Sequence, residues 1–240
     1  MAIFLIDPGG VIGYIEAIMN RIERENSMLK RTATLIALST ALGTAPAFCQ
    51  EGPLPAPKKS GGMPVMDTLQ KRQSARAFSD RALAPETLSS LLWAANGISR
   101  PDGRRTAPTA LNCQDMDVYV VTQEGGFRYN AEANALERAA TGDLRAWAGK
   151  QDYVKTAPVN LIYVQDLKKA KGTGKEEVAL FAGVHAGAIS QNVYLFCASE
   201  GLASVVRRNI DIEALHKALN LRADQVVILG QTVGYPAPAK

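Results

Sequence analysis

The chain has 240 residues, 47% of them hydrophobic, which is enough to bury a core and is not the composition of a disordered protein. Its formal net charge is +4 and its pI is near 9.0, without a long basic run. Because nucleic-acid-binding domains usually carry a concentrated basic face, this charge argues against a nucleic-acid partner and favours a small anionic ligand.

A secretory signal peptide is predicted over residues 28–47. Lys30 and Arg31 precede an apolar run over 33–42, which is followed by Ala45-Pro46-Ala47. A charged start, an apolar stretch and small residues at the cleavage site are the three parts of an export signal. The alternative is a short core helix, but the run leads into a stretch rich in Pro, Gly and Lys. We therefore expect an exported protein, located in the periplasm.

The predicted signal divides the chain into four parts. Residues 1–27 are expected to be an upstream extension or a mis-called start, 48–62 a linker, and 63–240 the folded domain. Cys113 and Cys197 lie far apart and form no C-x-x-C pair, so we expect both to be buried apolar residues.

Within 63–240 the apolar periodicity predicts helices and strands without the regular alternation of a doubly wound sheet. The fold class is therefore predicted to be α+β, with a mixed sheet flanked by helices. In chain order, the predicted elements are a helix over 66–73, a helix from Ala84 to Gly97, a loop over 99–107, a strand over 117–122 with a hairpin partner over 127–130, helical pieces within 133–150, a strand over 159–165, a loop over 168–175, a helix over 176–200, a helix over 212–219 and a strand over 225–233.

The long helix over 176–200 is unusually rich in Ala, Gly and Ser. Small side chains let other backbones approach closely, so this helix is either central in the core or pressed against a second subunit. The polar residues His185, Ser190 and Asn192 within it argue against a membrane span.

The stretch Lys71 to Phe78 reads KRQSARAF and places Arg72, Ser74 and Arg76 at alternate positions. In an extended segment this spacing puts all three side chains on one side, where two guanidinium groups and a hydroxyl bind one anion. A phosphate-bearing ligand is the natural guest. The alternative is a solvated charged stretch of the surface.

Three further motifs follow in order. They are Pro108-Thr109-Ala110-Leu111-Asn112-Cys113-Gln114 before a strand, Gly201-Leu202-Ala203-Ser204 after the long helix, and Gly234-Tyr235-Pro236 near the end. With R-x-S-x-R at 72–76, this set resembles the FMN-dependent nitroreductase family over most of residues 63–236. Thr109 stands where serine is usual in that family.

The resemblance implies a set of FMN contacts along the chain. Arg72 and Ser74 would hold the phosphate and the ribityl chain, and Arg76 would lie near the pyrimidine edge of the ring. The other implied contacts are Pro108, Thr109 and Asn112 at the ring, the backbone amides of Ala203, Ser204 and Val205 at the N5 side, Gln191 or Asn192 from the long helix, and Arg207 and Lys240 at the phosphate.

The resemblance also implies a function. A donor, expected to be NAD(P)H, would reduce the flavin, and an electron-poor nitroaromatic or quinone-like acceptor would then take the hydride from N5 in ping-pong fashion. Family members are generally homodimers with the flavin at the subunit interface. Two alternatives stay open: an exported flavin-binding protein without NAD(P)H turnover, because an exported protein would meet little NAD(P)H, and a dehydrogenase of another substrate on the same fold.

Overall fold

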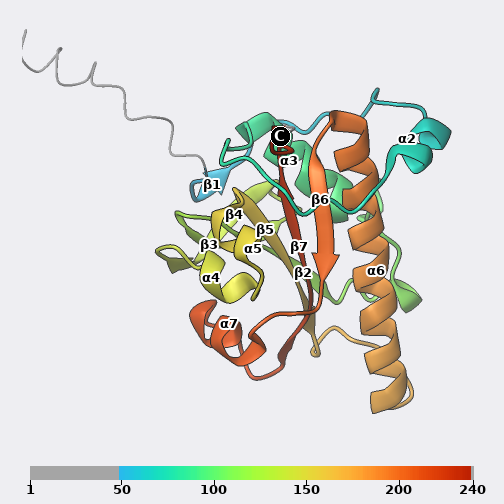
Figure 1. Ribbon diagram of the computed structural model, residues 1–240. Coiled ribbons are helices and arrows are strands. Elements are labelled where there is room, and N and C mark those ends of the chain that lie inside the picture. The colour runs from blue at the N-terminus through green and yellow to red at the C-terminus, as the bar shows by residue number, and fades with distance from the viewer. Residues whose placement is uncertain (1–48, 239–240) are drawn as a thin grey trace, which may run out of the picture. The chain divides into compact units, whose positions relative to one another are not determined.

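The computed structural model describes residues 49–238 of the protein. The predicted signal peptide at 28–47, residues 1–27 and Lys240 lie outside the described residues. The centre of the described part is a seven-stranded sheet with the strand order β1-β4-β3-β2-β5-β7-β6 (Figure 1). Its strands are β1 Gly52–Pro53, β2 Met116–Val121, β3 Gly125–Asn130, β4 Ala135–Thr141, β5 Val159–Asp166, β6 Ala203–Arg207 and β7 Gln225–Gly234.

Helices cover both faces of this sheet. The helices α3 and α6 lie on one face, α4, α5 and α7 lie on the other, and α2 packs against α6. Their bounds are α2 Val65–Lys71, α3 Pro85–Asn96, α4 Arg145–Ala148, α5 Asp152–Thr156, α6 Lys175–Glu200 and α7 Ile212–Ala218, with a short 3-10 turn, η1, over Ala110–Asn112.

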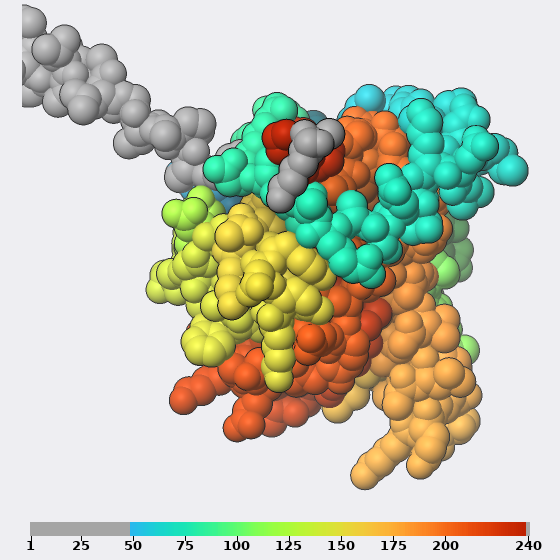
Figure 2. Space-filling model, in the orientation of Figure 1, coloured from blue at the N-terminus to red at the C-terminus, as the bar shows by residue number. Residues whose placement is uncertain are grey.

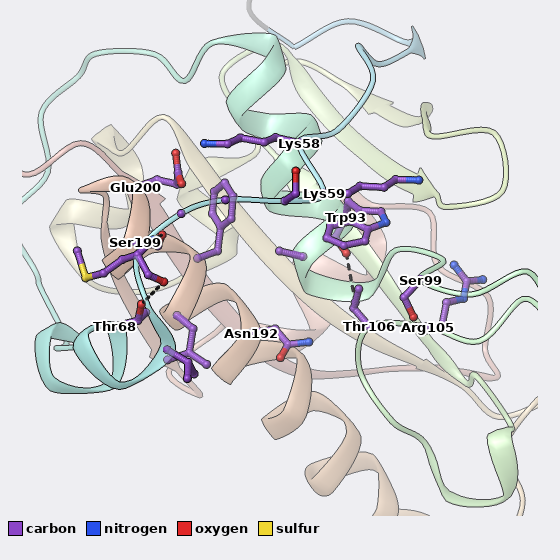
Figure 3. Close-up of a pocket in the computed structure, with 18 of the residues that line it drawn as sticks. Lys58, Lys59, Thr68, Trp93, Ser99, Arg105, Thr106, Asn192, Ser199 and Glu200 are labelled. Carbon is purple, nitrogen blue, oxygen red and sulfur yellow. Dashed lines mark hydrogen bonds between the residues drawn. The ribbon is translucent and has the colours of Figure 1, made fainter.

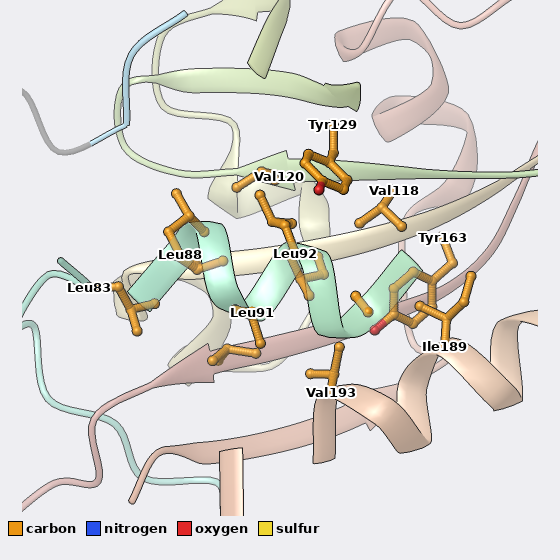
Figure 4. Packing of buried hydrophobic residues seen from close by; sticks show 14 of the residues in the cluster. Leu83, Leu88, Leu91, Leu92, Val118, Val120, Tyr129, Tyr163, Ile189 and Val193 are labelled. Atoms are coloured by element: carbon orange, nitrogen blue, oxygen red, sulfur yellow. The ribbon is translucent and has the colours of Figure 1, made fainter. Parts of the chain in front are cut away.

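Two hydrophobic cores form because side chains of a strand alternate between the faces of the sheet. Val118 and Val120 of β2 point into the core under α3 and α6, and Tyr119 and Val121 point into the core under α4, α5 and α7. Figure 4 shows Leu88, Leu91 and Leu92 of α3 packed among residues of β2, β3, β5 and α6. The interior strand β5 is mostly apolar and is buried along its whole length, including its polar residues Asn160, Gln165 and Asp166.

The predicted α+β class and the long helix are confirmed. Every strand pairing is antiparallel, however, so the sheet is antiparallel rather than mixed. By length and composition α6 could cross a membrane. In the folded domain its Ala186, Ile189 and Val193 are fully buried in the core, so α6 is a core helix.

Of the segment 133–150, in which helical pieces are predicted, only the second half contains a helix. The alanine-rich stretch Ala135–Thr141 is strand β4, paired with β3, and only Arg145–Ala148 is helical. Arg128 of β3 and Glu137 of β4 form an ion pair across the hairpin. Cross-strand pairing therefore overrides the helix propensity of alanine here.

Two other segments also differ from the prediction. Ala203–Arg207, expected only as a source of backbone amides, is the edge strand β6. The described residues of the predicted linker 48–62 are held by the domain: β1 pairs with β4, and the Pro55 carbonyl accepts a hydrogen bond from the Ser89 hydroxyl at 2.6 Å. These short strands carry no apolar alternation long enough to be recognised in the sequence.

Candidate functional site

The segment with the predicted phosphate ligands leaves α2 and crosses the edge strand β6. Arg72 ends α2 with a ψ of 121°, and the Ala75 N–H then donates to the Ser204 carbonyl at 2.9 Å. In Figure 2 this teal segment lies across the orange surface formed by α6 and β6. The extended backbone assumed from the R-x-S-x-R spacing is therefore present.

Tyr194 of α6 joins this segment to β6. Its hydroxyl accepts a hydrogen bond from the Val206 N–H at 2.8 Å and lies 2.8 Å from the Ser74 hydroxyl. The Arg72 guanidinium carbon is 5.2 Å from the centre of the Tyr194 ring, within the range of a cation–π interaction. Arg76 is exposed, and within residues 49–238 neither arginine forms an ion pair. Arg72 and Ser74 are thus placed where α6 and β6 meet, and Arg76 follows two residues later in the same segment.

The alternate side chains of the same segment point elsewhere. Lys71, Gln73 and Ala75 line a hollow of about 220 Å³ against the end of α6, and the three predicted ligands do not line it. Arg72 and Ser74 both contact Tyr194, as expected for two side chains on one side of an extended segment, and Tyr194 also lines this hollow.

Strand β6 limits which backbone groups can reach a ligand. The Val206 N–H points away from β7, to Tyr194, so by strand alternation the amides of Ala203 and Val205 point toward β7. The Ser204 hydroxyl accepts a hydrogen bond from Gln231 at 2.9 Å in the core. The amides of Ala203 and Val205, predicted as flavin contacts, are therefore used by the sheet.

Arg207 does not lie at the surface as a phosphate ligand would. It is 7% exposed, and one guanidinium nitrogen donates to the Ala148 carbonyl at 2.7 Å and to the Asn160 side chain at 3.0 Å. Burial lowers the pKa of Arg207 to about 10. The side chain predicted to bind phosphate instead fills the space between Gly149 and Gly230, where its Nε and Nη1 have no hydrogen-bond partner within the described residues.

Pro108, Thr109 and Asn112 lie in a strained turn. Leu111 has a φ of 51° and Asn112 a φ of 48°, in the left-handed region that non-glycine residues rarely adopt. Leu111 is 72% exposed, which is unusual for a leucine held in a strained conformation. Such strain is concentrated at functional sites, so this turn is the second half of the candidate site.

A buried polar network anchors this turn to α6. The Ala110 N–H donates to Nε2 of His185 at 2.8 Å, and Nδ1 of His185 lies 2.8 Å from a carboxylate oxygen of Asp115. Because Nε2 accepts, the ring proton is on Nδ1, and it is donated to Asp115. The other Asp115 oxygen accepts from Gln165 at 2.8 Å. Cys113, Asp115 and His185 come within 4.8 Å of one another, but both ring nitrogens have partners, so the ring has no free lone pair for a metal.

One chain does not bring the two halves of the site together. The Arg72–Ser74 segment contacts α6 at Tyr194 and the turn contacts it at His185, nine residues away. At about 100° per residue these side chains leave α6 on opposite sides, and they are about 13 Å apart along its axis. Gln191 is exposed between them, and Asn192 lies on the His185 side.

A pocket of about 520 Å³ lies on that same side of α6. Figure 3 shows Asn192 of α6 facing Trp93 of α3 and Thr106 across it, and Lys59 beside Trp93. Residues within 58–68 and the loop at 99–106 form the rest of its wall. This pocket was not predicted from the sequence, because its lining residues come from four separate segments.

The sequence model of the nitroreductase family matches residues 69–235. The chain belongs to the nitroreductase family. This family is a family of oxidoreductases. The matched range contains both halves of the candidate site.

Solved structures and a curated relative agree with this family. A proposed nitroreductase from Ralstonia eutropha JMP134 is 38% identical, with a TM-score of 0.74, and the match covers 78% of this chain and 89% of that one. A proposed nitroreductase from Methanocaldococcus jannaschii is 28% identical over 58% of this chain and 75% of its own length. The NADPH:FMN oxidoreductase of Vibrio harveyi, at 21% identity and a TM-score of 0.54 over 72% of this chain and 68% of that one, shares the fold.

Sequence reasoning missed the residues that hold the segments of the candidate site in place. Tyr194, His185 and Asp115 carry no motif, and each acts through a partner distant in the sequence. One signal was available in the sequence. Asp115 lies directly before an apolar strand and His185 lies within a helix of small residues, and a polar side chain that is buried at such a position needs a polar partner.

Proposed function

We propose that this nitroreductase-family protein is an FMN-dependent oxidoreductase that transfers a hydride from NADH or NADPH to electron-poor acceptors of the nitroaromatic or quinone class. The observation that carries the proposal is the extended Arg72–Ser74–Arg76 segment at the edge of β6. Two guanidinium groups without a carboxylate partner in the described chain, next to a hydroxyl, suit the phosphate and ribityl chain of FMN.

The chain's own residues would bind and orient the cofactor. Arg72 and Arg76 would supply charge-assisted hydrogen bonds to the anionic end, and Tyr194 would hold Ser74 in place. When bound, FMN supplies a ring nitrogen, N5, that can accept a hydride from one substrate and give it to the next. The protein's contribution is thus position and charge, and the proposal assigns no side chain as a nucleophile.

A homodimer would complete the site. The face of α6 between Tyr194 and His185 exposes Leu180 at 64% and Val184 at 57%, and a Cβ added at Gly183 or Gly187 would meet nothing within 4 Å. Exposed apolar residues next to open glycines suit close packing of a second helix. A second copy on this face would bring its strained turn toward the Arg72–Ser74 segment of the first.

Spectroscopy tests the proposal directly. The purified protein, supplied with FMN, should show the visible flavin band, which should bleach without oxygen when NADH or NADPH is added and return when a nitroaromatic or a quinone follows. A yellow protein that neither donor bleaches would favour the alternative of an exported flavin-binding protein without turnover, which the predicted signal peptide at 28–47 supports. Absence of any flavin binding would refute both.

A further inference from the structure

The 520 Å³ pocket beside α6 is separate from the Arg72–Ser74–Arg76 segment and has the size of a small-molecule site. Trp93 and Phe196 contribute aromatic surface to its wall. The Trp93 indole is fixed in orientation, because its N–H donates to the Ile98 carbonyl at 3.0 Å and Gly97 packs directly against it. The pocket therefore offers a preformed flat surface for a ring.

The charge of the pocket is strongly positive. Lys58, Lys59, Arg100 and Arg105 line it, with Glu200 as the acidic residue in its wall. The Lys59 ammonium lies over the Trp93 ring, 5.8 Å from its centre, so a cation is already held next to the aromatic surface. The hydroxyls of Ser99 and Thr106 and the amide of Asn192 add neutral hydrogen-bonding groups.

Two hydrogen bonds to neighbouring residues hold Arg105 of this pocket in place. Its Nε donates to the Gln114 side chain at 2.9 Å and a terminal nitrogen donates to the Asn96 carbonyl at 3.3 Å. Burial lowers the pKa of Arg105, but arginine stays charged at neutral pH. A half-buried, oriented guanidinium is a stronger anion site than a mobile surface lysine.

The same arginine connects the pocket to the strained turn. Gln114, which accepts from Arg105, donates through its side-chain amide to Asn112 at 3.2 Å and through its backbone to the Thr109 hydroxyl at 3.1 Å. Gln114 therefore links Arg105 of the pocket to Asn112 and Thr109, two residues predicted to contact the flavin.

We propose that this pocket binds an aromatic carboxylate, with the ring against Trp93 and the carboxylate between Lys59 and Arg105. In the proposed enzyme, and resting on that proposal, the pocket selects electron-poor acceptors that carry a negative charge. Uncharged acceptors of the same size gain only the aromatic contact.

Equilibrium binding tests this without turnover. The chain has two tryptophans, so Trp147→Phe leaves Trp93 as the only one. Quenching of its fluorescence, corrected for absorption by the ligand, is measured with 4-nitrobenzoate and with its uncharged analogue 4-nitrobenzamide. We expect saturable quenching and about tenfold tighter binding of the carboxylate, because an ionised hydrogen-bond partner is lost in the amide. The difference should shrink as salt is added.

Two variants and a control locate the effect. Arg105→Gln should weaken carboxylate binding about tenfold, and Lys59→Gln, at an exposed position with little risk to folding, about threefold, with amide binding unchanged. Arg104→Gln removes the same charge from the same loop but outside the pocket, where Arg104 pairs with Asp102 at 3.0 Å, and should change nothing. Equal affinity for the two ligands, or unchanged affinity in both variants, overturns the proposal.

The flavin spectrum of the same samples separates this proposal from the proposed function. A carboxylate preference in protein that binds no FMN supports the pocket assignment and refutes the oxidoreductase proposal. Flavin binding and turnover without a carboxylate preference supports the oxidoreductase proposal and refutes the pocket assignment.

Discussion

Nε2 of His185 on α6 accepts a hydrogen bond from the Ala110 N–H at 2.8 Å, across 75 residues of sequence. The opposite ring nitrogen is held by Asp115, which is 1% exposed. The backbone of a strained, exposed turn is thereby fixed by a buried neutral histidine. Conformational strain at Leu111 and Asn112 persists because this anchor compensates for it.

His185→Leu should both destabilise the domain and loosen the turn. It leaves the Ala110 N–H and one Asp115 oxygen without their partner in the interior, so the free energy of unfolding should fall by about 2–4 kcal/mol in urea denaturation. FMN affinity, measured on the folded fraction, should fall as well. His216→Gln, at a partly exposed histidine of α7, is the control and should cost less than about 1 kcal/mol. If His185→Leu unfolds like the wild type, the anchor is unimportant.

Arg207→Met should affect stability and leave flavin binding alone. The side chain is buried and donates to the Ala148 carbonyl, so its loss should reduce the free energy of unfolding by about 1–2 kcal/mol. FMN affinity of the folded variant should stay within about twofold of the wild type, since 7% exposure leaves no surface for a phosphate. A large loss of FMN affinity without a loss of stability would indicate that Arg207 binds the flavin after all.

Leu180→Asp combined with Val184→Asp should convert the proposed dimer into a monomer. Both side chains are more than half exposed on α6, so the change costs little in the isolated subunit, and four like charges would meet across a symmetric interface. Size-exclusion chromatography with light scattering gives the mass, and FMN retention should be lost with the dimer. Leu167→Asp, 42% exposed and off the helix, should stay dimeric. A monomeric wild type that retains FMN would contradict the two-chain site.

The hairpin of β3 and β4 should give a measurable acid dependence. The pKa of the Glu137 carboxyl is lowered below 4.5, first by a hydrogen bond from Asn130 and then by Arg128. A carboxyl whose pKa is lowered in the folded state stabilises it above the unfolded pKa, and this stabilisation is lost as pH falls through the folded value. Because the Glu137 side chain is 42% exposed, the wild type should exceed Glu137→Gln by only about 0.5–1 kcal/mol at pH 7.

Acid titration of unfolding free energy checks this. The difference between wild type and Glu137→Gln should disappear on acidification well below pH 4.5, whereas Glu132→Gln, at an exposed glutamate of the same hairpin, should match the wild type throughout. A difference that persists at the acidic end would mean that packing, and not charge, accounts for it.

The long or mostly apolar segments of the fold could be predicted from the sequence. Helix α6 spans 26 residues and strand β5 is a mostly apolar run of eight, and their predicted bounds differ from the observed ones by a residue at each end or less. Strands β4 and β6 could not be predicted, since Ala135–Thr141 favours a helix by composition and β6 is short. Their structure depends on partners in β3 and β7.

The candidate site follows the same division. The local spacing of Arg72 and Ser74 was sufficient to predict that both side chains lie on one side of an extended segment. Local spacing was insufficient to predict the direction of the Arg207 side chain or of the Ala203 and Val205 amides. Whether these groups face solvent or a neighbouring strand depends on the pairing of β6 with β7. The pocket beside Trp93 depends on tertiary packing alone.

The central claim is that Arg72 and Arg76 hold the anionic end of a flavin, and the FMN affinity of the Arg72→Ala, Arg76→Ala double variant tests it most directly. Lys150→Ala with Lys171→Ala removes the same charge from two exposed positions and serves as the control. Losing two charge-assisted contacts at about 1.5–3 kcal/mol each predicts FMN binding more than about a hundredfold weaker than in the control. A folded double variant that binds FMN as tightly as the control would contradict the account.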